Sequence, residues 1–364
     1  MMILPYNSFI SLNPFMQEIA AMKPIFRTLC FAFIAFASCA ALLWAAEAKQ
    51  MELKFPLGLD PDVFTVPEDN PLTEEKVELG KLLYFDKRIS VDNTVSCATC
   101  HAPAKGFTDQ LQFSRGFQDK TGDRNAPTVI NSAFALFQFW DGRAPSLEEQ
   151  AKGPMENPVE MAHSLDGAVN RIASIDGYKK YFIAAYGDPG VNIDRIVKAI
   201  ASFERTVLSG NSPWDRYVYG GDKTALSESA QRGLALFEGK ARCTQCHVGF
   251  NLSDGIFHNI GVGMNKEEPD LGRFKVTNLE SDKGAFKTPI LRDIQKTAPY
   301  MHDGSVNTLE EVVDFYDKGG EPNPWIDPKM QPLNLTDVEK ADLVAFLKSL
   351  EGDWTPIEEP ALPQ

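Results

Sequence analysis

Residues 97–101 read Cys-Ala-Thr-Cys-His, and residues 243–247 read Cys-Thr-Gln-Cys-His. Both stretches follow the pattern Cys-x-x-Cys-His, the attachment signature for c-type haem. Two thiols at this spacing can bond the two vinyl groups of a porphyrin, and the adjacent histidine can ligate the iron. We therefore predict two haem c groups, with two cysteines and one proximal histidine for each. The residues are Cys97, Cys100, His101, Cys243, Cys246 and His247.

Three other interpretations of these cysteines fit the pattern less well. A zinc site of two Cys-x-x-Cys pairs has them about 15–20 residues apart, whereas these pairs lie at 97–100 and 243–246. A redox-active Cys-x-x-Cys does not need a histidine after it in both copies. Disulfides within such close pairs would be strained.

Each motif follows a short helical pattern of apolar residues, around Gly80 in the first copy and Gly233 in the second. A helix that packs on a haem, followed by a Cys-x-x-Cys-His loop, is typical of a cytochrome c unit. Strand-like alternation is scarce, and loops with proline and glycine join the helices. We predict a mostly α fold of two cytochrome c-like haem domains packed together with long connecting loops, at residues 49–222 and 223–364.

Further helices are predicted at 147–153, 193–208 and 337–349. Ser146 with Glu149, and Thr336 with Glu339, have the spacing of capping boxes at two of their starts.

A helix is also predicted to begin after Thr308, which has Glu311 at capping-box spacing. Tyr316 falls on the apolar stripe of this helix, in register with Leu309 and Val313. Core packing and ligation of a metal both explain a phenol at that position.

The N-terminus resembles an export signal. Lys23 and Arg27 precede an apolar run, and Ala46-Glu47-Ala48 fits a small-x-small cleavage site. We expect residues 1–48 to form a targeting segment that is cleaved near residue 48, with Met22 as a candidate true start. An uncleaved membrane anchor is the alternative, because the apolar run is close to spanning length.

The composition is that of a globular protein, with 43% hydrophobic residues and a net charge of −14 over 364 residues. This acidic balance argues against nucleic acid as a partner. It suits a basic protein partner.

Two residues between the motifs can each be interpreted in two ways, as a chemical group or as a structural one. Trp140 has an oxidisable indole that can carry a hole between two metals, or it packs in the core. Glu160 lies between Val159 and Met161, so its carboxyl is an acid–base candidate for splitting an O–O bond. Otherwise Glu160 is a helix-start residue that faces water.

The chain resembles the bacterial di-haem cytochrome c peroxidase family, which includes the MauG proteins. The resemblance extends over about residues 70–350 in collinear order. It rests on CATCH, GDRNAPTVIN, FWDGRAPSLEEQAKGPMENPVEM, CTQCH, GRFKV and LRDIQKTAPYMHDGS.

The resemblance implies a peroxidatic haem on His101 and an electron-transfer haem on His247. It implies that Trp140 lies between the haems and that Glu160 is the distal acid–base residue, with Gln150 and Pro154 on the same side. It also implies a calcium ion between the domains. The calcium positions match Asn125, Thr297 and Pro299, and oxygen ligands suit this ion.

The chain departs from the better-known peroxidase pattern at two positions. Phe117 aligns where many family members have a histidine that ligates the first iron, so that haem should be open without reductive activation. His163 is a minor alternative ligand. Tyr316 aligns where those peroxidases place a methionine on the second iron, as in MauG-like members, and a phenolate stabilises ferric iron. Lesser candidates are Met301, Met330 and His302.

The leading expectation is a periplasmic peroxidase that reduces hydrogen peroxide with electrons from a small redox protein, either a cytochrome c or a cupredoxin. The alternative is a MauG-like enzyme that oxidises residues of a partner protein through a high-valent His/Tyr haem pair. A non-catalytic di-haem electron carrier is the third. The resemblance leaves a homodimer open, and no interface is legible in the sequence.

Overall fold

The computed structural model describes residues 50–354 and 357–364. The predicted targeting segment, residues 1–48, lies outside the described residues. Among the described residues, no helix is both long enough and apolar enough to cross a membrane.

The predicted mostly α fold is confirmed. The only strands in the described part of the chain are β1 and β2, two residues each, which pair antiparallel. The helices are α3 (Glu74–Phe85), α4 (Cys97–Cys100), α5 (Leu147–Glu156), α6 (Leu165–Ala173), α7 (Lys179–Tyr186), α8 (Ile193–Glu204), α9 (Pro213–Val218), α10 (Glu228–Glu238), α11 (Phe274–Thr277), α12 (Leu309–Asp317) and α13 (Asp337–Lys348); the strands are β1 (Phe257–His258) and β2 (Phe286–Lys287).

Helix starts follow the capping residues of the sequence. The boxes of Thr308 with Glu311 and of Thr336 with Glu339 are both formed. Ser146 accepts a hydrogen bond from the backbone N–H of Glu149, but the reciprocal half of that predicted box is absent. The Glu149 carboxylate instead accepts a hydrogen bond from Lys152, one turn along α5.

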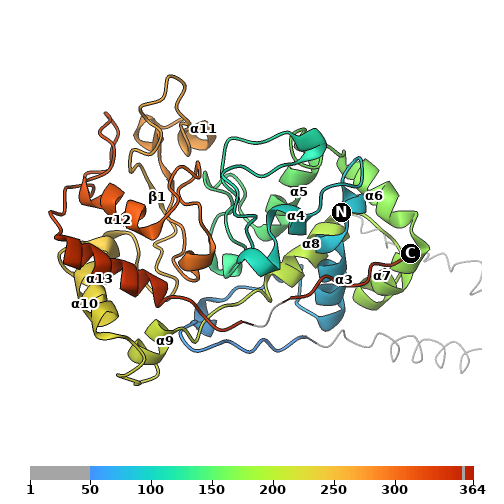
Figure 1. Ribbon diagram of the computed structural model, residues 1–364. Coiled ribbons are helices and arrows are strands. Elements are labelled where there is room, and N and C mark those ends of the chain that lie inside the picture. The colour runs from blue at the N-terminus through green and yellow to red at the C-terminus, as the bar shows by residue number, and fades with distance from the viewer. Residues whose placement is uncertain (1–49, 355–356) are drawn as a thin grey trace, which may run out of the picture. The chain divides into compact units, whose positions relative to one another are not determined.

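Buried apolar side chains gather into two clusters, one for each half of the chain. The first runs from Leu79 to Val207 and the second from Trp214 to Leu350. Figure 1 shows α3, α5, α6, α7 and α8 at one end and α10, α12 and α13 at the other. The mostly helical fold with two cytochrome c-like halves agrees with the sequence prediction, while the boundary at residue 222 stays a prediction.

The two halves repeat one helix crossing. Helix α3 packs on α8, and helix α10 packs on α13. A Cβ added to Gly80 would lie 1.8 Å from the Ala199 carbonyl oxygen, and one added to Gly233 would lie 1.9 Å from the Asp342 carbonyl oxygen. Only glycine permits helix backbones to approach this closely.

An aromatic pair also packs at each crossing, and its first member lies four residues after the glycine. Tyr84 packs on Phe203 with ring centroids 5.0 Å apart, and Phe237 packs on Phe346 at 4.9 Å. The same backbone approach and the same pair of rings therefore recur before each Cys-x-x-Cys-His motif.

Substituting alanine for Gly80 should destabilise the protein, because the added methyl group would force α3 away from α8. Overpacking of this kind costs about 1–3 kcal/mol. Gly122→Ala is the matched control, since a Cβ at Gly122 meets nothing within 4 Å. Thermal unfolding of the haem-loaded proteins measures the difference, and equal midpoints for the two variants would contradict the close crossing.

A buried ion pair between Asp215 and Arg292 also contacts the segment that precedes α3. Arg292 is 1% exposed and donates hydrogen bonds to both carboxylate oxygens of Asp215, at 2.7 and 2.9 Å. The same guanidinium donates to the carbonyl of Gly58 at 3.0 Å. Bidentate pairing of this kind satisfies both buried charges.

The C-terminal segment returns from α13 to the first half (Figure 1). Trp354, Ile357 and Leu362 pack against the first apolar cluster. At the end of this segment the carbonyl of Gln364 accepts a hydrogen bond from the N–H of Gly177, at 2.8 Å. Residues from the end of the chain thereby complete the surface of its first half.

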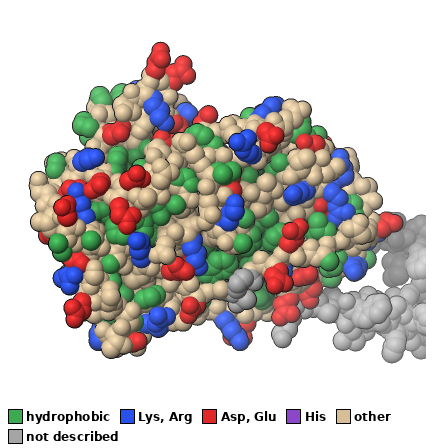
Figure 2. Space-filling view, viewed as in Figure 1, with side chains coloured by type: hydrophobic (Ala, Val, Ile, Leu, Met, Phe, Trp, Pro, Cys, Tyr) green, Lys and Arg blue, Asp and Glu red, His purple; other side chains and the backbone are tan. Residues whose placement is uncertain are grey.

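Charged side chains are mixed on the surface. Figure 2 shows lysine and arginine interspersed with aspartate and glutamate on this face, with no large basic area.

Candidate haem sites

The first Cys-x-x-Cys-His motif forms α4 and the residue that ends it. Nδ1 of His101 lies 3.3 Å from the carbonyl oxygen of Phe107. A carbonyl can only accept a hydrogen bond, so Nδ1 carries the proton and Nε2 is left free for a metal. The Tyr84 hydroxyl donates to the backbone carbonyl of His101 at 2.8 Å and fixes the start of the loop.

The second motif has the same arrangement. Nδ1 of His247 lies 2.7 Å from the carbonyl oxygen of Leu252, which again leaves Nε2 free. His247, Cys243 and Cys246 line a mostly apolar cavity of about 290 Å³. An apolar cavity with an oriented imidazole and two thiols fits a covalently attached haem.

The four cysteines are free thiols within the structure, so the disulfide alternative is not formed. Burial raises the pKa of Cys100 to about 11 and the pKa of Cys243 to about 12.

Glu160 lies near the first motif. Its negative charge contributes to the raised pKa values of both Cys97 and Cys100. Burial raises the pKa of Glu160 itself, against the opposing effects of a hydrogen bond from Asn157 and the positive charge of Arg143. Nδ2 of Asn157 donates to Oε1 of Glu160 at 2.6 Å. A carboxyl with a raised pKa and a fixed orientation can exchange a proton with a nearby oxygen.

The loop that carries Phe117 is attached to the same place. The N–H of Phe117 donates to the carbonyl of Glu160 at 2.7 Å. Phe117 therefore lies beside Glu160, the acid–base candidate. A histidine at position 117 would be close to the first haem site.

His163 is held away from an iron-ligating role in this structure. Its Nδ1 lies 3.0 Å from the carbonyl oxygen of Ile89. Its Nε2 lies 2.5 Å from the position that a Cβ on Gly167 would take, so this nitrogen faces helix α6.

The remaining predicted residues of the first site come from neighbouring segments. Gln150 and Pro154 are half-buried on α5. The carbonyl of Pro154 accepts a hydrogen bond from the N–H of Met161, which ties α5 to the residue after Glu160.

Trp140 lies at the junction of the two halves. Its Nε1–H donates to the carbonyl of Asn125 at 2.9 Å, and its own carbonyl accepts from the N–H of Lys287 at 2.8 Å. The indole also lines the cavity of the second motif. Backbone groups from both halves thus hold Trp140 in one orientation.

The structure partly gathers the three residues matched to calcium. Asn125 and Thr297 line the same cavity as Trp140, whereas Pro299 lines another cavity together with Leu111. Nδ2 of Asn125 donates to the carbonyl of Leu111 at 2.8 Å, which leaves Oδ1 as the available oxygen of this amide.

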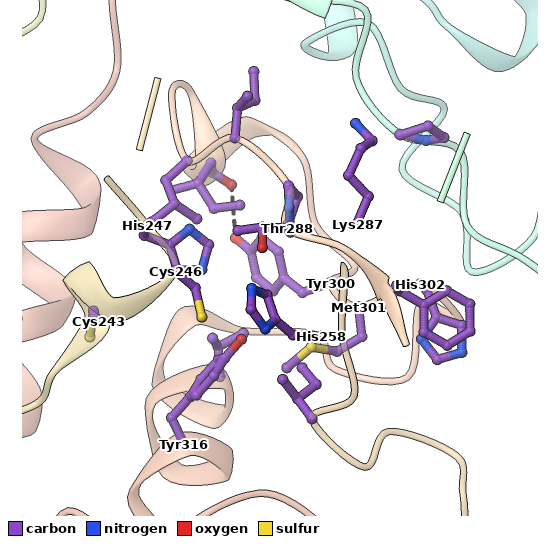
Figure 3. A pocket seen from close by; sticks show the side chains of 18 of the residues that line it. Cys243, Cys246, His247, His258, Lys287, Thr288, Tyr300, Met301, His302 and Tyr316 are labelled. Carbon is purple, nitrogen blue, oxygen red and sulfur yellow. Dashed lines mark hydrogen bonds between the residues drawn. The ribbon is translucent and has the colours of Figure 1, made fainter. Parts of the chain in front are cut away.

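Tyr316 points into the second cavity. Figure 3 shows its hydroxyl end directed toward Cys246 and His258. The predicted stripe of α12, with Leu309, Val312 and Val313, lines the same cavity. Burial raises the pKa of Tyr316 above its usual range, so a phenolate here requires a strong partner such as a metal.

The lesser ligand candidates have different surroundings. Met301 and Met330 also line the cavity. The His302 ring stacks on Phe286 with centroids 3.6 Å apart, which occupies one face of the imidazole.

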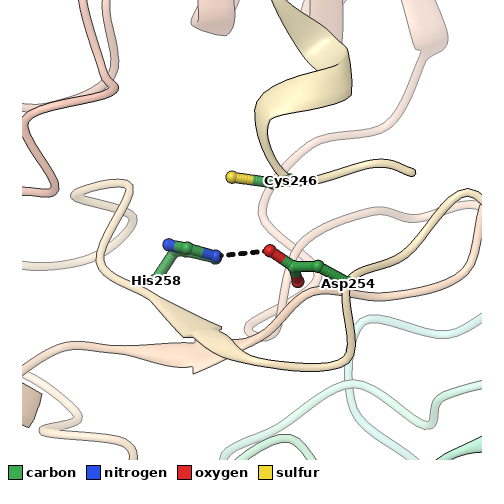
Figure 4. A group of neighbouring side chains, drawn as sticks. All are labelled: Cys246, Asp254 and His258. Atoms are coloured by element: carbon green, nitrogen blue, oxygen red, sulfur yellow. Dashed lines mark hydrogen bonds and ion pairs between the residues drawn. The ribbon is translucent and has the colours of Figure 1, made fainter.

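Sequence reasoning left the role of His258 open. Its Nδ1 lies 2.6 Å from Asp327 and its Nε2 lies 2.9 Å from Asp254, beside Cys246 (Figure 4). Interactions with Cys246 and the two carboxylates raise the pKa of His258 to about 9. His258 and its two carboxylate partners link β1 to the loop around Asp327 at the wall of the second cavity. No local pattern joins residues so far apart in the sequence.

The chain is similar to proteins of a known family. Residues 74–224 match the family described as Di-haem cytochrome c peroxidase. The chain is 43% identical to the methylamine utilization protein MauG of Methylorubrum extorquens over 83% of this chain and 86% of that protein. It is 40% identical to the cytochrome c551 peroxidase of Nitrosomonas europaea over 80% of this chain and 85% of that protein.

A solved structure is also similar. A MauG-like protein associated with microbial copper homeostasis matches with a TM-score of 0.74 and 34% identity, over 85% of this chain and 95% of that chain. The chain belongs to the di-haem cytochrome c peroxidase family of oxidoreductases, and its two Cys-x-x-Cys-His sites provide for the two haem c groups of that family.

Proposed function

We propose that this protein reduces hydrogen peroxide to water in the periplasm, with electrons from a small redox protein. Each peroxide takes up two electrons and two protons and gives two water molecules. The observation that carries this proposal is the half-buried Glu160, oriented by Asn157 beside the first haem-attachment motif. Cytochrome c or a cupredoxin would supply the electrons.

Glu160 would move the proton that O–O cleavage requires. Haem iron, when bound, supplies the peroxide-binding site and the electrons. The carboxylate of Glu160 would take a proton from one oxygen of a bound peroxide and return it to the departing oxygen. Asn157 keeps Oε1 in place, and the positive charge of Arg143 opposes the rise in the pKa of Glu160 that burial causes.

Phe117 supports peroxide access without prior reduction. A phenylalanine cannot ligate iron, and the backbone hydrogen bond to Glu160 fixes its loop at this site. We propose that the haem on His101 has an open position in the fully oxidised protein.

Tyr316 favours a second candidate function. A His247/Tyr316 pair would stabilise the oxidised state of the second haem, and Trp140 lies between the halves. These features suit an enzyme that uses peroxide to oxidise residues of a protein partner. The relative from Methylorubrum extorquens is named for methylamine utilization.

We also propose a calcium ion near Asn125, Thr297 and Pro299. An amide oxygen and backbone carbonyls are ligands that calcium accepts, with water filling the remaining positions. The backbone carbonyl of Asn125 accepts a hydrogen bond from the indole N–H of Trp140. An ion bound by Asn125 would therefore stabilise the position of Trp140.

The first experiment is absorption and EPR spectroscopy of the fully oxidised protein, before and after one equivalent of hydrogen peroxide. We expect a high-spin ferric signal that disappears with peroxide without prior reduction. Two low-spin, unreactive haems would contradict the open site and favour an electron carrier. Turnover with reduced cytochrome c or a reduced cupredoxin then separates peroxide reduction from oxidation of a protein partner.

A further inference from the structure

Lys287 is a cationic residue on the wall of the second cavity. It has no role in the peroxide reaction proposed above. It lies on β2 opposite Phe257 of β1, and its N–H donates to the carbonyl of Trp140 at 2.8 Å. The backbone of Lys287 is therefore fixed on two sides, which limits where its side chain can reach.

The ammonium group has no partner among the described residues. Within residues 50–354 and 357–364, no carboxylate forms an ion pair with Lys287 Nζ, and neither a charged group nor a hydrogen bond contributes to its pKa. Burial lowers the pKa of Lys287 to about 8, with no compensating interaction. Lys287 is half-buried. A cation with restricted access to water and no counter-charge is costly, so a bound anion would stabilise it.

The other cations on this wall differ from Lys287. Lys329 donates to the carbonyl of Gln245 at 3.0 Å and lies beside Cys246. His258 is held between two carboxylates. Arg242 is exposed and directly precedes Cys243. These three belong to, or lie near, the side where the thioether bonds form.

Lys287 lies on the opposite side. Figure 3 shows Cys243 and Cys246 at one side of the cavity and Lys287 at the other. In a haem c the two propionates leave the porphyrin on the side away from the thioether-bearing edge. The carboxylates would therefore extend toward the wall that carries Lys287.

We propose that Lys287 binds a propionate of the haem attached to Cys243 and Cys246. This ion pair would place the carboxylate beside the backbone of Trp140, at the junction of the halves. It would also make the haem easier to reduce, because a nearby positive charge favours the ferrous state. The inference requires the second haem and does not depend on which substrate is oxidised.

The test compares Lys287→Met with Lys287→Arg and with Lys348→Met, which removes an exposed lysine of α13. Pyridine haemochrome and protein mass first establish that each variant carries two haems. Spectroelectrochemistry then measures both midpoint potentials, and resonance Raman measures the propionate bending bands. None of these measurements uses peroxide, so a failed peroxidase proposal would leave this test intact.

For Lys287→Met we expect about a tenfold shift of the second haem toward the ferric state, which is about 59 mV for one electron, together with a shifted propionate band. Lys287→Arg and Lys348→Met should resemble the unaltered protein. An unchanged potential and an unchanged band in Lys287→Met would overturn the proposal. Lys287→Gln serves for the same comparison if the methionine variant takes up one haem only.

Discussion

Replacing Glu160 by glutamine should slow the reaction with hydrogen peroxide by about 100-fold or more, the effect expected for loss of a general acid–base group. Glutamine keeps the shape and can still bond to Asn157, but it cannot take the proton of the bound peroxide. Both haem spectra should stay as they are, because Glu160 ligates no iron in this proposal. Stopped-flow absorption of the oxidised protein with peroxide measures the rate.

Glu156→Gln provides the control, since Glu156 is an exposed carboxylate at the end of α5, four residues before Glu160. It should react at the normal rate, and an equal rate for Glu160→Gln would remove Glu160 from the mechanism. The unaltered protein should also lose rate as the pH falls through the raised pKa of Glu160, because the first step requires the carboxylate.

Replacing Tyr316 by methionine should raise the midpoint potential of the second haem and give it a methionine-ligated spectrum. Phenolate stabilises ferric iron, whereas methionine favours the ferrous state, and axial ligands set haem potentials over a range of about 0.8 V. Absorption spectra and potentiometric titration measure both changes.

Tyr300→Phe separates ligation from packing. Tyr300 lines the same cavity, but its hydroxyl donates to the carbonyl of Ile294 at 3.1 Å. The Tyr300 variant should keep the spectrum of the unaltered protein. A spectrum that Tyr316→Met also leaves unaltered would refute Tyr316 as an iron ligand and return it to core packing.

The features that depend on near neighbours were predictable from sequence. The Cys-x-x-Cys-His motifs, the starts of α12 and α13, and the apolar stripe that ends at Tyr316 are set by residues within one or two turns. Ser146 shows the limit of such reasoning. Its partner Glu149 lies at the right spacing for a capping box, yet Lys152 competes for the carboxylate.

Residues that meet only through the fold were not predictable in this way. Asp327 contacts His258 although 69 positions separate them, and the backbone N–H of Lys287 on β2 donates a hydrogen bond to the carbonyl of Trp140 on a distant loop. These contacts follow no period, so a single sequence gives no signal for them. The resemblance supplied the positions of Glu160 and Trp140, and the structure supplies the contacts that would orient them.

The return of the C-terminal segment to the first half has a consequence for biosynthesis. The ribosome synthesises the residues of the first apolar cluster, Leu79 to Val207, before it synthesises Ile357 and Leu362, which pack against that cluster. Until then the surface that these side chains cover is open, and Gly177 lacks its bond to Gln364. The first half can therefore reach its final packing only after the last residues of the second half have been translated.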